Sequence, residues 1–286
     1  MTRPFEPGER SPDERGPGPR GPEPEDAVPG RMVVVVPTYN EALNLEGVVG
    51  RLLRAVPSAD VLVVDDASPD GTGDLADRLA DREPRVRVLH RAGKTGLGAA
   101  YLDGFAVALA REYDVVGEMD ADGSHQPEQL PRLIAALPDA DLVIGSRWVP
   151  GGSVVNWSRF RKALSVGGNL YARTLLGIPV HDVTAGFRLF RASTLQRIGL
   201  DAVESVGYCF QTDLTLRTVR AGLRVREVPI EFVEREQGES KMDRAVAWES
   251  LRRITTWGLA ERRDQIRGRG RGVRSMAQVG TGRGTR

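Results

Sequence analysis

Short runs of apolar, mostly β-branched residues alternate along the first half of the chain with longer stretches in which apolar residues recur every three or four positions. The short runs predict buried strands at residues 32–36, 61–64, 86–89, 115–119 and 142–144. The longer stretches predict helices at residues 41–56, around 75–79, and at 96–110 and 130–137. This alternation predicts an α/β fold with a mostly parallel sheet, helices on both faces, and ligands bound beyond the carboxyl ends of the strands.

The second half of the chain alternates less regularly. Its pattern predicts, in order, a long helix, a short extended segment, a helix, a strand and a last helix at residues 156–176, 187–190, 210–221, 223–233 and 242–259. Two of these helices are candidate membrane surfaces, because their apolar residues are flanked by cationic ones. The residues concerned are Trp248, Leu251, Ile254 and Trp257 in the last helix, and Trp157, Phe160 and Leu164 in the long one. Packing of the last helix on the core explains its stripe equally well.

Composition divides the chain into a folded middle and two unlike ends. We expect one catalytic domain at residues 31–260, a length that can bury one good core. Residues 1–30 are crowded with Pro, Gly, Glu and Arg, and residues 261–286 with Arg and Gly. Because neither end has the hydrophobic period of a packed element, both are predicted to be disordered tails.

Charge and cysteine content exclude several classes of site. Lys plus Arg (40) nearly balance Asp plus Glu (39), so the overall charge does not favour a nucleic-acid partner. The single Cys209 excludes an intrachain disulfide and, with three scattered histidines, a Cys/His zinc site, which fits a reducing cytoplasmic setting. Since no long run of apolar residues could span a bilayer, we expect any membrane contact to be peripheral.

The acidic run Asp120-Ala-Asp122 follows a predicted strand directly and precedes Gly123-Ser124. Two carboxylates at a strand end are hard oxygen ligands, which hold Mg²⁺ or Mn²⁺ together with substrate phosphates. A metal held in this way neutralises a leaving diphosphate. A plain acidic turn has the same sequence, but the position at the strand end favours a metal site.

Two other loops have residues suited to a nucleotide. Asp65 and Asp66 follow the strand at 61–64, where a carboxylate can accept hydrogen bonds from a base or ribose; the Pro-Asp-Gly sequence after them is also typical of a simple turn. Lys94 lies in the glycine-rich run 93–98, which matches neither the Walker pattern nor G-x-G-x-x-G. An anion could bind there to backbone amides and the lysine, or the run could simply begin a helix.

Cationic residues follow the acidic run. Arg147 comes shortly after the strand at 142–144, and Arg159, Arg161 and Lys162 lie in the next predicted helix. Phosphate-rich substrates need such groups near the leaving and attacking oxygens. Any one of them alone is better explained as a solvated surface charge, but a cluster downstream of a metal site favours phosphate binding.

Together these motifs resemble those of the GT-A glycosyltransferases of family 2, and among them the polyprenol (dolichol) monophosphomannose synthases. The resemblance covers residues 31–258. It rests on Pro37-Thr-Tyr-Asn-Glu41, Val64-Asp-Asp-Ala-Ser-Pro-Asp-Gly-Thr72, Gly93-Lys-Thr-Gly-Leu-Gly-Ala-Ala-Tyr101, Asp120-Ala-Asp122, Asn156-Trp157, Arg161-Lys162, Asp182-Val-Thr-Ala-Gly-Phe-Arg188, Gly207-Tyr-Cys-Phe-Gln211 and Gly238-Glu-Ser-Lys241.

The resemblance implies a GT-A, Rossmann-like domain and a role for each matching residue. The guanosine part of a donor would be held by Pro37, Tyr39, Glu41 and Asp66, with Asp65 nearby. A metal would be surrounded by Asp120, Asp122 and Ser124, at whose position many relatives carry Gln. The phosphates of donor and acceptor would be gripped by Arg147, Arg161 and Arg235, with Ser165 near the acceptor phosphate and Lys241 helping to close the site.

The implied activity is transfer of mannose from GDP-mannose to a polyprenyl phosphate, with inversion at the anomeric carbon. Because a phosphate nucleophile is already anionic near neutral pH, no general base is needed. Asp122, Arg147, Arg161 and Arg235 would then act by positioning and charge stabilisation. A neutral hydroxyl acceptor would instead need a base, for which Asp213 and Glu204 are candidates.

Two alternatives stay open at this point. A glucosyltransferase that uses UDP-glucose and the same lipid acceptor would need the same metal site. A non-catalytic protein whose basic tail binds lipid or RNA would explain the tail alone. Because no segment could span a bilayer, we expect peripheral attachment to the inner face of the cell membrane. Resemblance to actinobacterial synthases adds the expectation of a membrane-protein partner.

Overall fold

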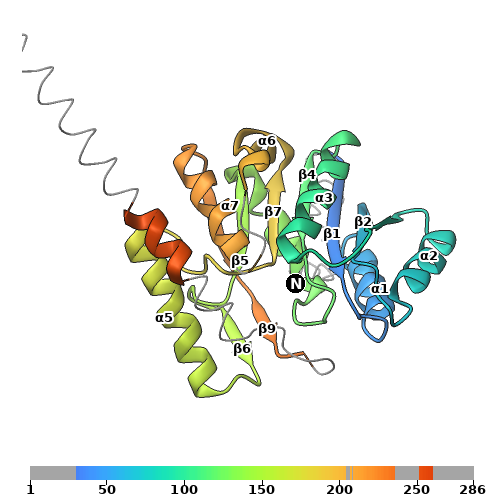
Figure 1. Cartoon of the computed structure of the whole chain (residues 1–286), viewed down its shortest axis with the longest axis horizontal. Coiled ribbons are helices and arrows are strands. Elements are labelled where there is room, and N and C mark those ends of the chain that lie inside the picture. The colour runs from blue at the N-terminus through green and yellow to red at the C-terminus, as the bar shows by residue number, and fades with distance from the viewer. Residues whose placement is uncertain (1–29, 204–206, 208, 236–250, 260–286) are drawn as a thin grey trace, which may run out of the picture.

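A seven-stranded sheet lies at the centre of the molecule in a computed structural model, which describes residues 30–203, 207, 209–235 and 251–259 (Figure 1). The strand order is β3-β2-β1-β4-β7-β5-β8. The strands are β1 Met32–Thr38, β2 Ala59–Asp65, β3 Val86–His90, β4 Val115–Glu118, β5 Leu142–Ser146, β7 Arg188–Arg191 and β8 Val225–Pro229. The antiparallel β7 separates β4 from β5, and the remaining pairs are parallel. The predicted mostly parallel sheet is therefore confirmed.

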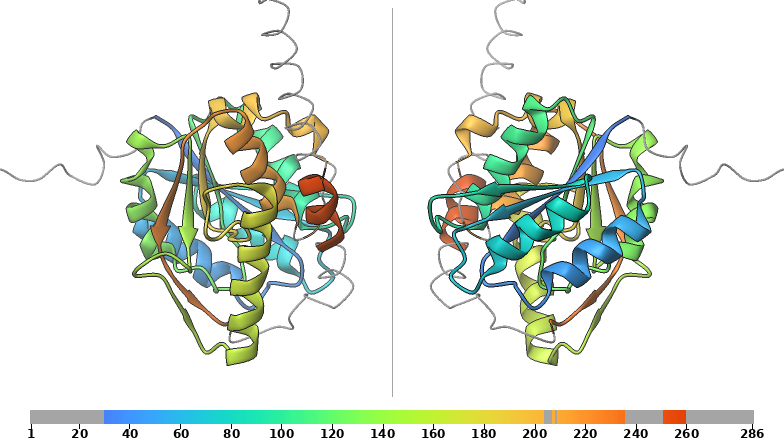
Figure 2. Two further views of the ribbon diagram at one scale, coloured as in Figure 1. Left: turned by 90° about the vertical axis from the view of Figure 1, so that its left-hand side faces the viewer. Right: turned by 90° about the vertical axis from the view of Figure 1, so that its right-hand side faces the viewer.

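Helices cover both faces of this sheet (Figure 2). They are α1 Leu45–Ala55, α2 Thr72–Arg82, α3 Leu97–Ala110, α4 Leu130–Ile134, α5 Arg159–Leu176, α6 Ala192–Arg197, α7 Cys209–Arg220 and residues 251–259. Alternate residues of β1 point to opposite faces. Val33 and Val35 pack with α3, α7 and the end of α5, whereas Val34 and Val36 pack with α1, α2 and α4. The apolar run of β1 is thus buried on both sides, as its composition predicts.

The predicted strand at 223–233 is wrong in one respect, because the chain crosses there from one sheet to another. Strand β8 ends at Pro229 and pairs with β5, whereas β9 Glu231–Val233 pairs with β6 Ser153–Val155 in a separate two-stranded sheet. Ile230 between them is buried against the core, and its amide donates to the carbonyl of Ser146 at 3.0 Å. An apolar pattern alone does not show which sheet each half joins.

Several other boundaries differ from the prediction. Helix α1 begins at Leu45 rather than residue 41, after a turn in which the Glu41 carbonyl accepts from the Asn44 and Leu45 amides. Helix α5 begins after Ser158, whose hydroxyl accepts from the Arg161 amide. Helix α4 ends at Ile134, and neither β6 nor α6 was predicted. Residues 1–29 and 261–286 of the predicted tails and residues 242–250 of the last helix lie outside the described residues.

The two candidate membrane surfaces differ in exposure. In the last helix Ile254 is buried and Trp257 packs against the core, so for these two residues the core interpretation holds; Trp248 lies outside the described residues. On α5, by contrast, Phe160 and Leu164 are 78% and 56% exposed. Over the part of the chain that the structure describes, no helix combines the length and apolarity needed to cross a membrane.

Candidate active site

The predicted nucleotide and metal loops come together because β2, β1 and β4 are neighbours in the sheet. Thr38 at the end of β1 lies opposite Asp65 at the end of β2, and Val35 lies opposite Glu118 at the end of β4. The Thr38 hydroxyl donates to Asp65 Oδ1 at 2.9 Å, which joins the first two loops directly. Parallel strands therefore deliver three of the predicted motifs to one edge of the sheet.

The acidic pair Asp120 and Asp122 is held by polar groups from three elements. The Tyr101 hydroxyl on α3 donates to Asp120 Oδ1 at 3.1 Å, and the Asp120 amide donates to Nδ1 of His125 at 3.1 Å. Arg235 Nη2 lies 3.2 Å from Asp122 Oδ2. Burial raises the pKa of Asp120, whereas the Ser124 hydrogen bonds and Arg235 overcome burial and lower the pKa of Asp122. The pair thus lies in a polar, preorganised setting.

This pair suits a divalent cation by the chemistry of its donor atoms. Mg²⁺ and Mn²⁺ take oxygen ligands, and Mg²⁺ is commonly bound by one or two carboxylates plus substrate phosphates. Within the described residues no cluster of three or more His, Cys, Asp or Glu side chains could hold a metal without such help. Ser124 donates its hydroxyl to Asp122 Oδ1 at 2.6 Å, so here it supports that carboxylate, and its role as a ligand stays a prediction.

The carboxylates of the predicted nucleoside loop already have protein partners. Asp65 accepts from the Ser68 amide at 3.1 Å and the Ser68 hydroxyl at 2.6 Å, and Asp66 pairs with Arg91. Asp70 accepts from the Thr72 amide at 3.0 Å, which makes this stretch the predicted turn. Asp65 and Asp66 therefore lie at the end of a strand, as predicted, and the predicted turn follows them.

The other nucleoside residues border the same loop. Glu41 is buried and accepts from the Asn44 side chain at 3.0 Å, and Pro37 lies opposite Val64 within the sheet. Lys94 Nζ lies 3.9 Å from the centre of the Tyr39 ring, so the glycine-rich run meets the loop after β1. The predicted helix start is also present, since α3 begins at Leu97.

Each predicted phosphate-binding arginine has a carboxylate partner. Arg147 makes a two-pronged contact with the fully buried Asp182, in which Nε to Oδ2 and Nη2 to Oδ1 both measure 2.7 Å. Arg161 pairs with Glu234, and Arg235 with Asp122. Arg161 also lies over the Trp157 ring, 4.1 Å from its centre, and Arg147 lies 5.6 Å from the same ring. The structure therefore brings the three cations and the acidic pair into one connected region.

Ser165 lies one helical turn after Arg161 on α5, and its carbonyl accepts from the Asn169 side chain at 3.0 Å. Asn169 in turn donates to Thr184 at 3.2 Å, which places this side of α5 beside Arg147. Lys241 lies outside the described residues.

Several supporting residues were not predicted. Neither Glu234 nor His125 is named among the sequence predictions, which include Asp182 only within a motif. The sign that could have pointed to Asp182 is its partner Arg147, a cation that directly follows a strand. Glu118 and Arg188 form a second, fully buried pair with 3.8 Å between Oε2 and Nε. Burial raises the pKa of Glu118 to about 8 and lowers that of Arg188 to about 10. The sequence signals Glu118 only by its position, because it is an acidic residue at the end of an apolar strand, two residues before Asp120.

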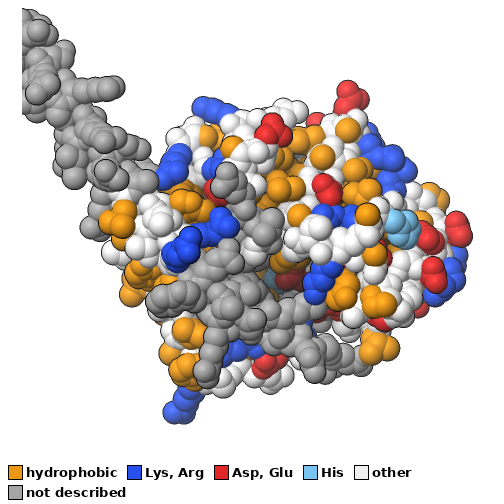
Figure 3. All heavy atoms as spheres, viewed as in Figure 1, with side chains coloured by type: hydrophobic (Ala, Val, Ile, Leu, Met, Phe, Trp, Pro, Cys, Tyr) orange, Lys and Arg blue, Asp and Glu red, His pale blue; other side chains and the backbone are white. Residues whose placement is uncertain are grey.

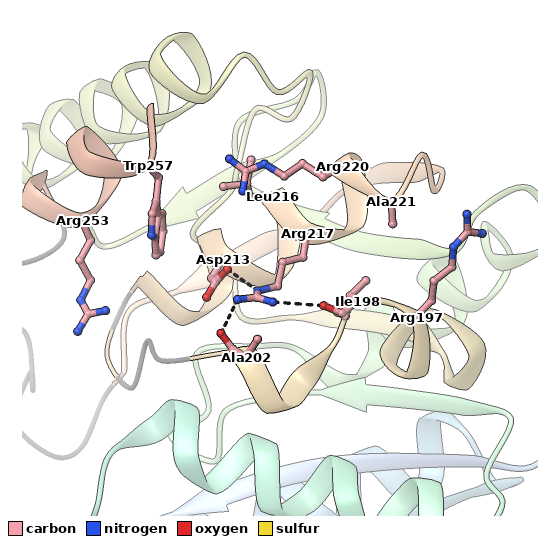
Figure 4. A pocket seen from close by; sticks show the side chains of 10 residues that line it. All are labelled: Arg197, Ile198, Ala202, Asp213, Leu216, Arg217, Arg220, Ala221, Arg253 and Trp257. Carbon is pink, nitrogen blue, oxygen red and sulfur yellow. Dashed lines mark hydrogen bonds and ion pairs between the residues drawn. The ribbon is translucent and has the colours of Figure 1, made fainter. Parts of the chain in front are cut away.

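A hollow of about 440 Å³ lies away from these residues, between α6, α7 and the helix at 251–259 (Figure 4). Asp213, the candidate base for a hydroxyl acceptor, lines it and pairs with Arg217 at 2.7 Å. Arg217 also donates to the carbonyls of Ile198 and Ala202. None of the residues predicted to hold donor, metal or acceptor lines this hollow, and Glu204 lies outside the described residues.

Comparison with known proteins identifies close relatives of the chain. The chain is 59% identical to an undecaprenyl-phosphate mannosyltransferase of Micrococcus luteus over 84% of its own length and 98% of that protein. It is 54% identical to a polyprenol monophosphomannose synthase of Mycolicibacterium smegmatis, over 83% and 91% of the two chains.

Solved structures share the fold at lower identity. One is glucosyl-3-phosphoglycerate synthase of Mycobacterium tuberculosis with Mn²⁺, UDP-glucose and phosphoglyceric acid, with a TM-score of 0.63 at 22% identity over 86% of each chain. Another is a mannosyltransferase of Pyrobaculum calidifontis with GDP-Man and Mn²⁺, with a TM-score of 0.53 at 21% identity over 86% of this chain and 67% of that one. The family model for glycosyl transferase family 2 matches residues 33–199. The chain therefore belongs to glycosyl transferase family 2.

Proposed function

We propose that this glycosyltransferase moves mannose from GDP-mannose to a polyprenyl phosphate, with inversion, and so makes polyprenyl-phosphate mannose. The observation that carries the proposal is the 3.2 Å contact between Asp122 and Arg235, because it joins an acidic pair suited to a donor diphosphate to a group of arginines suited to a second phosphate. The names of the mannosyl-transferring relatives from M. luteus and M. smegmatis support the same lipid acceptor and sugar.

The proposal assigns Mg²⁺ or Mn²⁺ to Asp120 and Asp122. Such a cation supplies positive charge to the diphosphate that leaves with the nucleoside. The mannosyltransferase of similar fold that was solved with GDP-Man and Mn²⁺ supports this choice. Tyr101 and Ser124 would keep the two carboxylates in place through their hydrogen bonds at 3.1 Å and 2.6 Å.

The arginines would solve the electrostatic problem of bringing two anions together. A phosphomonoester is already an anionic nucleophile near neutral pH, since its second pKa is about 6. Arg161 and Arg235 would lower the repulsion between donor and acceptor phosphates, while Asp182 fixes the plane of Arg147. In-line attack on the anomeric carbon then gives inversion without a general base.

The long helix α5 supplies a surface for the lipid part of the acceptor. Phe160, Leu164 and Leu170 are 78%, 56% and 60% exposed, and hydrophobic side chains gather over α5 at the left of Figure 3. Arg161 and Ser165 lie on the adjacent, half-buried side of the same helix. A lipid whose chain stays in the membrane could therefore present its phosphate at the inner side of α5.

This arrangement supports peripheral attachment to the inner face of the cell membrane. Arg159 and Lys162 are exposed next to the apolar side chains, which favours a surface of anionic lipid. A membrane-protein partner and the absence of a nucleic-acid partner stay predictions.

A donor assay tests the proposed activity. Purified protein, Mn²⁺ and polyprenyl phosphate would be supplied with GDP-mannose or UDP-glucose, and the lipid product would be identified by mass. We expect a mannolipid from GDP-mannose. Formation of a glucolipid with no mannolipid would instead support the UDP-glucose alternative.

A further inference from the structure

Two neighbouring residues of opposite charge, Glu234 and Arg235, each pair with a different half of the site. The Glu234 carboxylate pairs with the guanidinium of Arg161 on α5. The next residue, Arg235, places Nη2 3.2 Å from Asp122 Oδ2 in the acidic loop. One short segment after β9 therefore pairs at the same time with the proposed phosphate-binding Arg161 and the proposed metal-binding Asp122.

The main chain of this segment is attached on both sides. The Val233 amide donates to the carbonyl of Ser124 in the acidic loop, and the Glu234 amide donates to the carbonyl of Val155 in β6, both at 3.1 Å. Phe232 pairs with His125 through the backbone, and its ring lies 5.4 Å from that of Trp157. A displacement at Asp122 thus has a continuous path of contacts to Arg161.

Charge makes the two occupied positions mutually dependent. A divalent cation at Asp122 and the Arg235 guanidinium are both positive, so they compete for the same carboxylate oxygen. An acceptor phosphate and the Glu234 carboxylate are both negative, so they compete for the Arg161 guanidinium. The Trp157 ring, 4.1 Å from Arg161, keeps the guanidinium plane in place whichever anion it holds.

We propose that Glu234 is a positioning residue whose carboxylate pairs with Arg161 in the place of the acceptor phosphate. When a divalent cation with a nucleoside diphosphate binds Asp122 and displaces Arg235, the segment Glu234–Arg235 moves and the pair between Glu234 and Arg161 breaks. This inference rests on the proposed function, because it assigns the acceptor phosphate to Arg161. The donor half of the site therefore promotes binding in the acceptor half, and the effect is reciprocal.

Equilibrium binding of a short-chain prenyl phosphate, geranyl phosphate, tests this coupling without turnover. Its dissociation constant would be measured by calorimetry with the full chain, with and without Mn²⁺ and GDP. For the unaltered protein we expect Mn²⁺ and GDP to tighten binding by about 5-fold or more, the lower range of measured coupling between sites. In Glu234→Gln, geranyl phosphate should bind more tightly without Mn²⁺ and GDP, and their addition should then change the affinity less than 2-fold, roughly the level of no coupling.

Two further variants separate this role from a general effect of charge. Glu231→Gln removes an exposed carboxylate three positions earlier on β9 and should keep the coupling of the unaltered protein. Glu234→Asp keeps the charge but shortens the reach to Arg161, so it should weaken the coupling. Equal coupling in Glu234→Gln and the unaltered protein would overturn the inference and leave the proposed function standing. If geranyl phosphate and longer polyprenyl phosphates fail to bind the unaltered protein in either condition, the proposed acceptor is wrong and the inference fails with it.

Discussion

Arg147 and Asp182 form a two-pronged ion pair in which both side-chain contacts measure 2.7 Å, and the Arg147 amide donates to the same carboxylate at 2.9 Å. Asp182 is fully buried and Arg147 is 9% exposed. Although burial opposes ionisation, Arg147 lowers the pKa of Asp182. The pair fixes the end of β5 to the loop before β7, so the same contact supports both the fold and the position of one predicted phosphate-binding group.

Asp182→Asn should therefore cost both stability and activity. Removing one partner of a buried pair leaves the other charge uncompensated, which destabilises a protein by about 3–5 kcal/mol. Urea unfolding measures this, with Glu128→Gln as the control, because Glu128 pairs with Arg51 at 2.6 Å but is 55% exposed. The control should change the free energy of unfolding by about 1 kcal/mol or less. A loss no larger in Asp182→Asn than in the control would show that the buried pair contributes little.

Tyr101→Phe should impair transfer with little effect on folding. The ring stacks on Phe210 with centroids 5.9 Å apart and would stay in place, but Asp120 would lose its 3.1 Å hydrogen bond. Removing a group that orients a metal ligand typically costs about 10–100-fold in metal affinity or activity. Mn²⁺ dependence of the initial rate measures the effect. Tyr113→Phe, which removes a hydroxyl bonded to Asp60 at the other end of the sheet, should leave that dependence unchanged.

The buried Glu118 predicts a pH dependence of stability. Its pKa is about 8 in the folded protein and near 4.5 in an unfolded chain, so between these values the folded state holds more protons. The free energy of unfolding should therefore fall as the pH rises through this window, by roughly 4 kcal/mol at most.

Glu118→Gln removes this titration, so its stability should fall less between pH 5 and pH 8. Urea unfolding in metal-free buffer at both pH values measures the difference. Glu231→Gln, at an exposed position, should behave as the unaltered protein does. An equal fall in Glu118→Gln would mean that Glu118 is ionised throughout the range.

The exposed side of α5 predicts membrane binding. Phe160→Ser with Leu164→Ser removes two side chains that are 78% and 56% exposed. Binding to anionic vesicles in a sedimentation assay should therefore drop about 100-fold or more, the loss expected when two side chains of this size are no longer buried in lipid. Leu43→Ser, at a site 82% exposed and outside α5, is the matched control. If transfer to geranyl phosphate is retained while vesicle binding is lost, the surface serves attachment alone. Unchanged vesicle binding in the double variant would remove α5 from the account.

Much of the donor half of the site could be predicted from sequence, because its residues follow apolar strands. The runs before Asp65 and Asp120 are long enough to identify strands β2 and β4, and parallel strands end at one edge. The acceptor half depends on pairs that are distant in the chain. Arg147 and Asp182 are 35 positions apart, and Arg161 and Glu234 are 73 apart. Periodicity contains no information about such partners.

Short elements were the other source of error. Strands β6 and β9 have three residues each, too few to show an alternating pattern, yet their pairing brings Glu234 and Arg235 to the site. The long α5 was predicted almost in full from its apolar spacing, which is a local feature, but the predicted start lay before the cap at Ser158. Only the structure shows that, among the residues it describes, the outer apolar side of α5 is exposed and not packed against another element.

The rate at which Asp122→Asn transfers mannose from GDP-mannose to polyprenyl phosphate, compared with that of the unaltered protein, shows whether the acidic pair holds the donor diphosphate. Asp74→Asn, an exposed position on α2, is the matched control. Because Asp122 would supply part of the charge stabilisation of the leaving diphosphate, the rate of mannolipid formation should fall by about 100-fold or more in Asp122→Asn and stay unchanged in the control. Full transfer activity in Asp122→Asn would contradict the account.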